Sequence, residues 1–170
     1  VYVDARNAIF AGSSTVAYVY SPLVNYEENG VYYTYYNLFI NGEKTSVNVP
    51  KTLVGADPTA LFAGTGLYTL GYNADASQVI SVAPITANVV TGTIASVSGA
   101  VVRATDDAKS FNAENAKVYF VVKDVVNNTL VDVEVKAIED LAGVVGANFT
   151  YTYSSNSWNA DVVYVEVEMD

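Results

Sequence analysis

Alternation of apolar and polar residues divides the chain into short segments separated by Gly, Pro and Asn. The clearest pair of segments lies at residues 31–49 and flanks Asn41-Gly42. Asn-Gly is the strongest short-range signal for a two-residue β-hairpin, because a type I′ turn needs a positive φ at both central positions. In the second segment, Lys44–Val49, valines alternate with polar residues. We therefore predict a hairpin whose second strand has one side in water.

Strict alternation also assigns the side chains of the first hairpin strand to two faces. Tyr33, Tyr35 and Phe39 should share one face, and Leu38 and Ile40 should share the other. Both faces then carry large apolar groups. We expect this strand to be covered on both sides.

The same reasoning predicts elements along the rest of the chain. Val1–Asp4 is a short strand, and Thr15–Tyr20 is an interior strand because both of its faces are apolar. Asp57-Pro58 marks the start of one short helix, with Asp57 as its N-cap. In Leu130–Ala137 valines alternate with charged residues, which predicts a half-exposed strand. The remaining strands are predicted at Leu67–Tyr72, Val79–Ala83, Val90–Val97, Ala100–Ala104, Lys117–Lys123, Phe149–Tyr153 and Val162–Glu168.

Two parts of the chain share one plan. Leu67–Ala83 and Phe149–Val167 each consist of an aromatic strand, a turn of Asn, Asp and Ser, and a valine-rich strand. Each part would close one half of the chain. Short strands at hairpin spacing, without a long helical period, predict an all-β fold of two small tandem β-barrel or β-sandwich units, residues 1–85 and 86–170. One continuous β-sandwich is the alternative.

Composition narrows the possible functions. Fourteen Tyr stand against six Phe and one Trp, and tyrosine suits half-exposed sheet faces, carbohydrate-contacting surfaces or sheet packing. Eight basic and eighteen acidic residues give a net charge of −10, which makes nucleic acid an unfavourable partner. The absence of Cys and His excludes the usual zinc sites, thiol catalysis and Ser-His-Asp triads. No apolar run approaches the ~20 residues of a membrane helix, so we expect no membrane insertion.

An acidic stretch offers one candidate metal site. Asp106, Asp107 and Glu114 lie close in sequence, and Ca²⁺ prefers six to eight oxygen ligands. No EF-hand or nonapeptide spacing accompanies them. The plainer interpretation is a solvated acidic loop, so no cofactor is expected and Ca²⁺ is the one that the sequence leaves open.

Aromatic residues offer one candidate binding site. Tyr151, Tyr153 and Trp158 lie within one predicted hairpin, and exposed rings of this kind stack on sugars. The alternative is that Trp158 packs over the end of the core. A glycan-acting enzyme would need two carboxylates facing each other at ~5–10 Å. None of the acidic residues lies in an apolar context that would raise its pKa, so we expect no enzyme and no catalytic residues.

Several segments carry a resemblance to a known class of proteins: Gly66–Asp75, Thr91–Val102, Ala116–Val122, Val133–Leu141 and Ser155–Glu168. Together they resemble the β-rich modules of Gram-positive cell-surface proteins that carry S-layer homology (SLH) domains. The resemblance implies an extracellular protein of the cell wall or surface layer, without an assigned reaction. Its partners would be other surface-protein modules or cell-wall glycan.

These observations lead to one expected function and two alternatives. We expect a non-catalytic structural module of a bacterial cell-surface or S-layer-associated protein, secreted and arranged in tandem repeats, that acts as a spacer or assembly element. The first alternative is a carbohydrate-binding or adhesive module, and the second is a glycan-acting enzyme. Because the chain starts at Val1 without methionine, we also expect it to be a piece of a longer protein.

Overall fold

The fold is all-β, as predicted. The computed structural model describes residues 14–20, 26–28, 30–62 and 64–169, so the strand predicted at Val1–Asp4 lies outside the described residues. Strands account for 55% of the described chain and helices for 12%. Neither of the two described sheets closes into a barrel. Among the described residues, no helix combines the length and the apolar character needed to span a membrane.

The chain forms two compact units, unit 1 (Val1–Ile85) and unit 2 (Thr86–Asp170). Unit 1 contains β1 (Ser14–Val19), β2 (Tyr26–Glu28), β3 (Tyr32–Ile40), β4 (Glu43–Pro50), α2 (Lys51–Val54), the 3₁₀ turn η1 (Pro58–Ala60), β5 (Gly66–Tyr72) and β6 (Val79–Pro84). Unit 2 contains β7 (Val89–Ser98), β8 (Val101–Ala104), η2 (Asp107–Lys109), β9 (Phe111–Asn112), β10 (Lys117–Asp124), β11 (Thr129–Lys136), η3 (Ile138–Val144), β12 (Asn148–Thr152) and β13 (Val162–Glu168).

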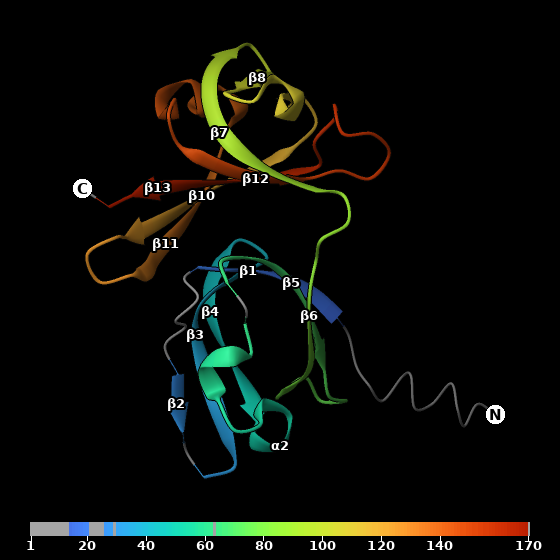
Figure 1. Ribbon diagram of the computed structural model, residues 1–170, viewed down its shortest axis with the longest axis vertical. Coiled ribbons are helices and arrows are strands. Elements are labelled where there is room, and N and C mark those ends of the chain that lie inside the picture. Colours follow the sequence, from blue (N-terminus) through green and yellow to red (C-terminus); the bar gives the residue numbers. More distant parts are fainter. Residues whose placement is uncertain (1–13, 21–25, 29, 63, 170) are drawn as a thin grey trace, which may run out of the picture. The chain divides into compact units, whose positions relative to one another are not determined.

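The sheet of unit 1 has the strand order β2-β3-β1-β5-β6, and β4 pairs with β3 (Figure 1). β1 lies between β3 and β5, which confirms the predicted interior strand. β3 and β4 form the predicted hairpin, and both Asn41 (φ 50°) and Gly42 (φ 87°) have positive φ, as a type I′ turn requires. On β4, Val47 and Val49 are buried while Lys44 and Ser46 are exposed, so one side faces water as predicted.

A β-bulge makes the predicted faces of β3 wrong. The register of β3 with β4 shifts between Tyr35 and Leu38, where Asn37 has a φ of 63°. The extra residue reverses the alternation. Tyr35 and Leu38 therefore belong to the same hydrophobic cluster, with Tyr33 and Ile40 packed against it. Strict alternation had placed Leu38 and Ile40 on the opposite face from Tyr33 and Tyr35.

Tyrosines fasten a connecting segment over the core of unit 1. Phe62 follows η1 and is buried edge-on against Tyr35 and Tyr68, at ring-centroid distances of 5.4 and 5.1 Å. The Tyr35 hydroxyl donates to the Pro58 carbonyl at 2.7 Å, and the Tyr68 hydroxyl donates to the Gly64 carbonyl at 2.7 Å. Tyrosine performs both tasks because its ring is apolar and its tip forms hydrogen bonds. Asp57 caps η1 as predicted, whereas the alternation gave no sign of α2.

The sheet of unit 2 has the strand order β11-β10-β13-β12-β7-β8-β9. All its pairs are antiparallel except β10 with β13, which is parallel over the strands described. The unit has its own hydrophobic cluster, in which Phe111, Phe149 and Tyr151 form the aromatic centre. Each unit thus has its own hydrophobic cluster.

β11 is more exposed than a half-covered strand. It pairs with β10 on one side and is the end strand of its sheet in the described chain. The valine side also reaches the surface, since Val131 is 37% exposed and Val135 is 71% exposed. Asp132, Glu134 and Lys136 occupy the same strand, and charged residues on an end strand discourage pairing with another chain.

Candidate functional site

The turn before β13 holds Trp158 in a fixed position. Asn156 Oδ1 accepts hydrogen bonds from the backbone N–H of Trp158 at 3.1 Å and of Asn159 at 3.2 Å. The Trp158 carbonyl accepts from the Asn112 N–H at 2.6 Å. The Tyr151 hydroxyl donates to the Ser157 carbonyl at 2.7 Å. The turn is therefore tied both to β9 and to the core.

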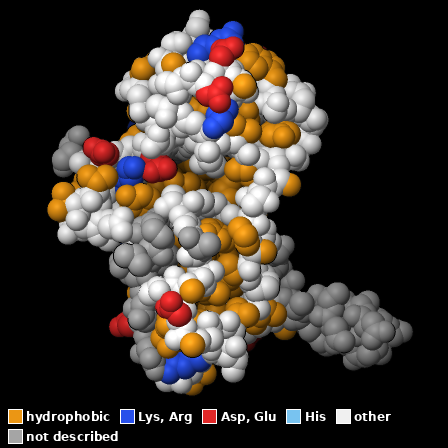
Figure 2. Space-filling view, viewed as in Figure 1, with side chains coloured by type: hydrophobic (Ala, Val, Ile, Leu, Met, Phe, Trp, Pro, Cys, Tyr) orange, Lys and Arg blue, Asp and Glu red, His pale blue; other side chains and the backbone are white. Residues whose placement is uncertain are grey.

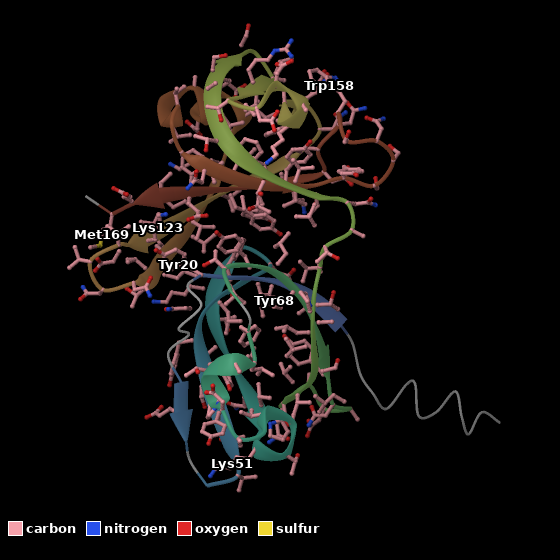
Figure 3. The ribbon with its side chains drawn as sticks, viewed as in Figure 1. Tyr20, Lys51, Tyr68, Lys123, Trp158 and Met169 are labelled. Carbon is pink, nitrogen blue, oxygen red and sulfur yellow. The ribbon has the colours of Figure 1, made fainter. Side chains whose placement is uncertain are left out.

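The three predicted aromatic residues have different environments. Trp158 is 40% exposed at the surface of unit 2 (Figure 3), and the Arg103 guanidinium lies 5.7 Å from its ring centroid. Tyr153 is half-buried against the core, and Tyr151 is 1% exposed within it. Tyr151 has no free ring face for a sugar and serves instead to support the turn. The surface offers one indole beside one guanidinium, a pair that favours aromatic–cation contact.

The predicted acidic site consists of residues with separate structural roles. The Asp106 carboxylate accepts from the Ala108 N–H at 3.3 Å and caps η2. Asp107 is exposed and pairs with Arg103 at 3.7 Å. Glu114 is exposed, and its N–H donates to the Asn112 side chain at 2.9 Å. Within the part of the chain that the structure describes, no three Asp or Glu side chains are grouped closely enough to hold a metal ion.

Asp and Asn side chains shape the turns throughout both units. In each case the side-chain oxygen accepts a hydrogen bond from the backbone N–H two residues later, at 2.9–3.3 Å. This is the Asx turn, which stabilises a reversal of the chain. The side chains are those of Asp57, Asp75, Asp106, Asn112, Asp124 and Asn156. The four aspartates among them therefore act in local structure.

Two of these carboxylates are poor candidates for a general acid. Hydrogen bonds from Ser77 hold the pKa of Asp75 below its ordinary value, and hydrogen bonds from Asn127 do the same for Asp124. A general acid at neutral pH needs the opposite shift, which burial produces. Both carboxylates are exposed at turns.

Unit 1 contains an open groove of about 400 Å³ between the β3–β4 hairpin and the β5–β6 turn. Ile40, Glu43 and Val47 line one wall, and Tyr72 and Val79 line the other. Burial raises the pKa of Tyr72. Sequence reasoning missed this groove, because β4 and the β5–β6 turn are far apart along the chain. On the face that Figure 2 shows, charged side chains are few and scattered.

Both units contain the same arrangement of three strands, which we call the three-strand clamp. In unit 1 it consists of β1, β5 and β6, and in unit 2 of β7, β12 and β13. The first and last strands run in the same direction, and the middle strand runs between them in the opposite direction. In each clamp the middle and last strands form a hairpin. These two hairpins are the segments whose sequences share one plan.

The chain enters and leaves each clamp at opposite ends. In unit 1, Ser14 starts β1 opposite Gly71, while Pro84 ends β6 opposite Tyr68. In unit 2 the chain enters β7 at one end of the sheet, and β13 ends at the other (Figure 1).

Comparison with models of known protein families gives no match, and comparison with curated proteins gives none.

Proposed function

We propose that this chain is a non-catalytic structural module of a bacterial cell-surface or S-layer-associated protein, in which it acts as a spacer or assembly element. The observation that carries the proposal is the three-strand clamp of each unit. Because the chain enters each clamp at one end and leaves it at the other, each unit adds its own length to a spacer. The cell-surface location rests on the resemblance of Thr91–Val102 and Ser155–Glu168, among other segments, to surface-protein modules.

The roles of the polar residues support a structural function. The Asx side chains close turns, and the hydroxyls of Tyr35, Tyr68 and Tyr151 fasten connecting segments to the sheets. Stability then depends on packing and backbone pairing, and requires neither a cofactor nor a disulfide. Such modules can be joined in series.

Surface labelling tests the proposal directly. An antibody raised against residues 86–170 should bind intact cells of the source bacterium, and protease added outside the cells should remove the signal. Antibody against a cytoplasmic protein is the control. Signal that appears only after cell lysis would contradict the surface location.

Carbohydrate binding is the second candidate, because Trp158 is 40% exposed on an ordered turn. Trp158 is the one tryptophan of the sequence, so its fluorescence reports on this surface alone. Added cell-wall glycan should shift the emission if the indole binds sugar. The matched control is Arg103→Gln, which leaves the indole in place and removes the cation beside it. An unchanged spectrum up to millimolar glycan would exclude this candidate.

A further inference from the structure

The last strands of the two clamps are held differently. β6 pairs with β5 on one side, and in the part of the chain that the structure describes it has no second paired neighbour. β13 pairs with β12 on one side and with β10 on the other. In the described strands, five residue pairs join β6 to β5. Four pairs join β13 to β12, and seven more join it to β10. Many more backbone hydrogen bonds must therefore break to release β13.

Side-chain packing also holds β13 more firmly than β6. On β6, Val79 is buried, but Ile80 is 41% exposed and Ala83 is exposed. On β13, Val163 and Val165 are fully buried in the core of unit 2. The ladder of β6 also contains a bulge, beside Tyr72. A bulge leaves a residue unpaired and interrupts the ladder.

Cross-strand contacts strengthen the hold on β13. The Lys123 ammonium of β10 lies 2.7 Å from the Glu166 carboxylate of β13, and both side chains are less than one-fifth exposed. Tyr119 and Tyr164 stack across the same two strands at 5.8 Å. The Met169 N–H donates a hydrogen bond to the Lys123 carbonyl at 2.8 Å, and Figure 3 labels the two residues beside each other. Within the residues that the structure describes, β6 pairs with β5 alone and takes part in no ion pair.

We propose that the chain bears tension along its strands, and that unit 1 opens before unit 2 because β6 is released first. The proposal rests on the proposed function as a structural spacer. A pull on the two ends of a clamp moves its first and last strands in opposite directions. The hydrogen bonds of an antiparallel ladder are perpendicular to the strands, so this pull loads all the bonds of the β5–β6 ladder together. The last strand that is held by the fewest residue pairs in total, and is the less buried, is released first, and this strand is β6.

Release of β6 opens the rest of unit 1. The pull then passes through the β5–β6 turn to the carboxyl end of β5, where it separates β5 from β1 one residue pair at a time. Unit 1 would lengthen by roughly 70 residues, or about 250 Å at ~3.6 Å per residue. Unit 2 remains folded at this force. The chain would thus extend in two steps.

Single-molecule force spectroscopy of the full chain, held between two handles, tests the proposal. The unaltered chain should show two rupture events at clearly different forces. The chain contains no Cys, so an introduced pair forms a defined disulfide. Thr69 and Ala83 are directly opposite on β5 and β6. Oxidised Thr69→Cys/Ala83→Cys should raise the lower of the two forces and shorten its length increment by ~14 residues, about 50 Å.

A matched pair in unit 2 gives the control. Thr152 and Val162 are directly opposite on β12 and β13, and oxidised Thr152→Cys/Val162→Cys should leave the lower-force event unchanged and shorten only the higher-force one. Reduction should restore the original pattern in both variants. If the lower force instead responds to the unit 2 pair, or if both events occur at one force, the proposal is wrong.

A second variant keeps the test decisive if an oxidised protein fails to fold. Val79→Ala removes the buried side chain of β6. It should lower the smaller force and leave the larger one unchanged. These measurements are made outside the cell, so failure of the force order leaves the surface location standing, and failure of surface labelling leaves the force order standing.

Discussion

Gly92 lies where a single added methyl group should disturb the core of unit 2. It is directly opposite Phe149, on β7 and β12 respectively. A Cβ at position 92 would stand 2.8 Å from Phe149 Cζ and 3.2 Å from Cε2. The ring has little freedom to move, because Phe111 and Tyr151 pack against it at centroid distances of 5.1 and 5.9 Å. We predict that Gly92→Ala destabilises unit 2.

Two opposing effects determine how much Gly92→Ala changes the free energy of unfolding of unit 2. Replacing glycine by alanine in a strand gains roughly 0.5–1 kcal/mol from the reduced entropy of the unfolded chain. Overpacking a tight core costs roughly 1–3 kcal/mol. The steric effect is larger, so we expect a net loss of about 1–2 kcal/mol. For a unit of this size the melting midpoint should fall by about 4–16 °C.

Tryptophan fluorescence during urea unfolding measures the effect, because the one tryptophan, Trp158, lies in unit 2. Gly143→Ala is the matched control, since a Cβ there meets no atom within 4 Å. Adding Phe149→Leu to Gly92→Ala should cost less than the sum of the two single changes, because the shorter side chain vacates the contested space. If Gly92→Ala unfolds at the same urea concentration as Gly143→Ala, Phe149 does not pack against Gly92.

Three further predictions concern other parts of the chain. Gly42→Val should cost unit 1 roughly 1–3 kcal/mol, since φ is 87° there, and an unchanged melting midpoint would contradict the type I′ turn. Burial, and then the neighbouring Tyr119, raise the pKa of Tyr164 to about 12 from an ordinary value of 10.0. The corresponding stability is complete below pH 10 and is lost as the pH rises through 12, by up to about 3 kcal/mol, and Tyr164→Phe should remove this difference in alkaline melting curves. Residues 86–170 should fold alone, and collapsed amide resonances in the NMR spectrum of this fragment would show that its core is incomplete.

Local features of the fold could be predicted from the sequence. The hairpin at Asn41-Gly42 and the cap at Asp57 were correct, because each depends on the conformational preference of one or two adjacent residues. The bulge at Asn37 was missed. Asparagine tolerates positive φ, but nothing in the alternation of Tyr33–Ile40 indicates where an extra residue enters the ladder.

The candidate binding site shows a different limit of sequence reasoning. The sequence places Tyr151, Tyr153 and Trp158 in one hairpin, and the structure confirms the hairpin. Burial decides what the rings can do, and it depends on Phe111 and other residues that are distant in the chain. Tyr151 is in the core for that reason. Its hydroxyl still reaches the Ser157 carbonyl, so the same tyrosine is both a core residue and a support for the exposed Trp158.

The three-strand clamp could not be read from either hairpin alone. The likeness of the β5–β6 and β12–β13 hairpins was visible in the sequence, but the strand that completes each clamp comes from earlier in its unit. β1 pairs with β5 across three intervening strands, and β7 pairs with β12 across four. Pairing at such separation is set by which apolar faces meet. The mechanical difference between the units also arises there, because β10 pairs with β13 in parallel while β6 is the edge strand of its sheet as far as the structure describes it. Two hairpins of similar sequence thus differ in strength through their neighbours.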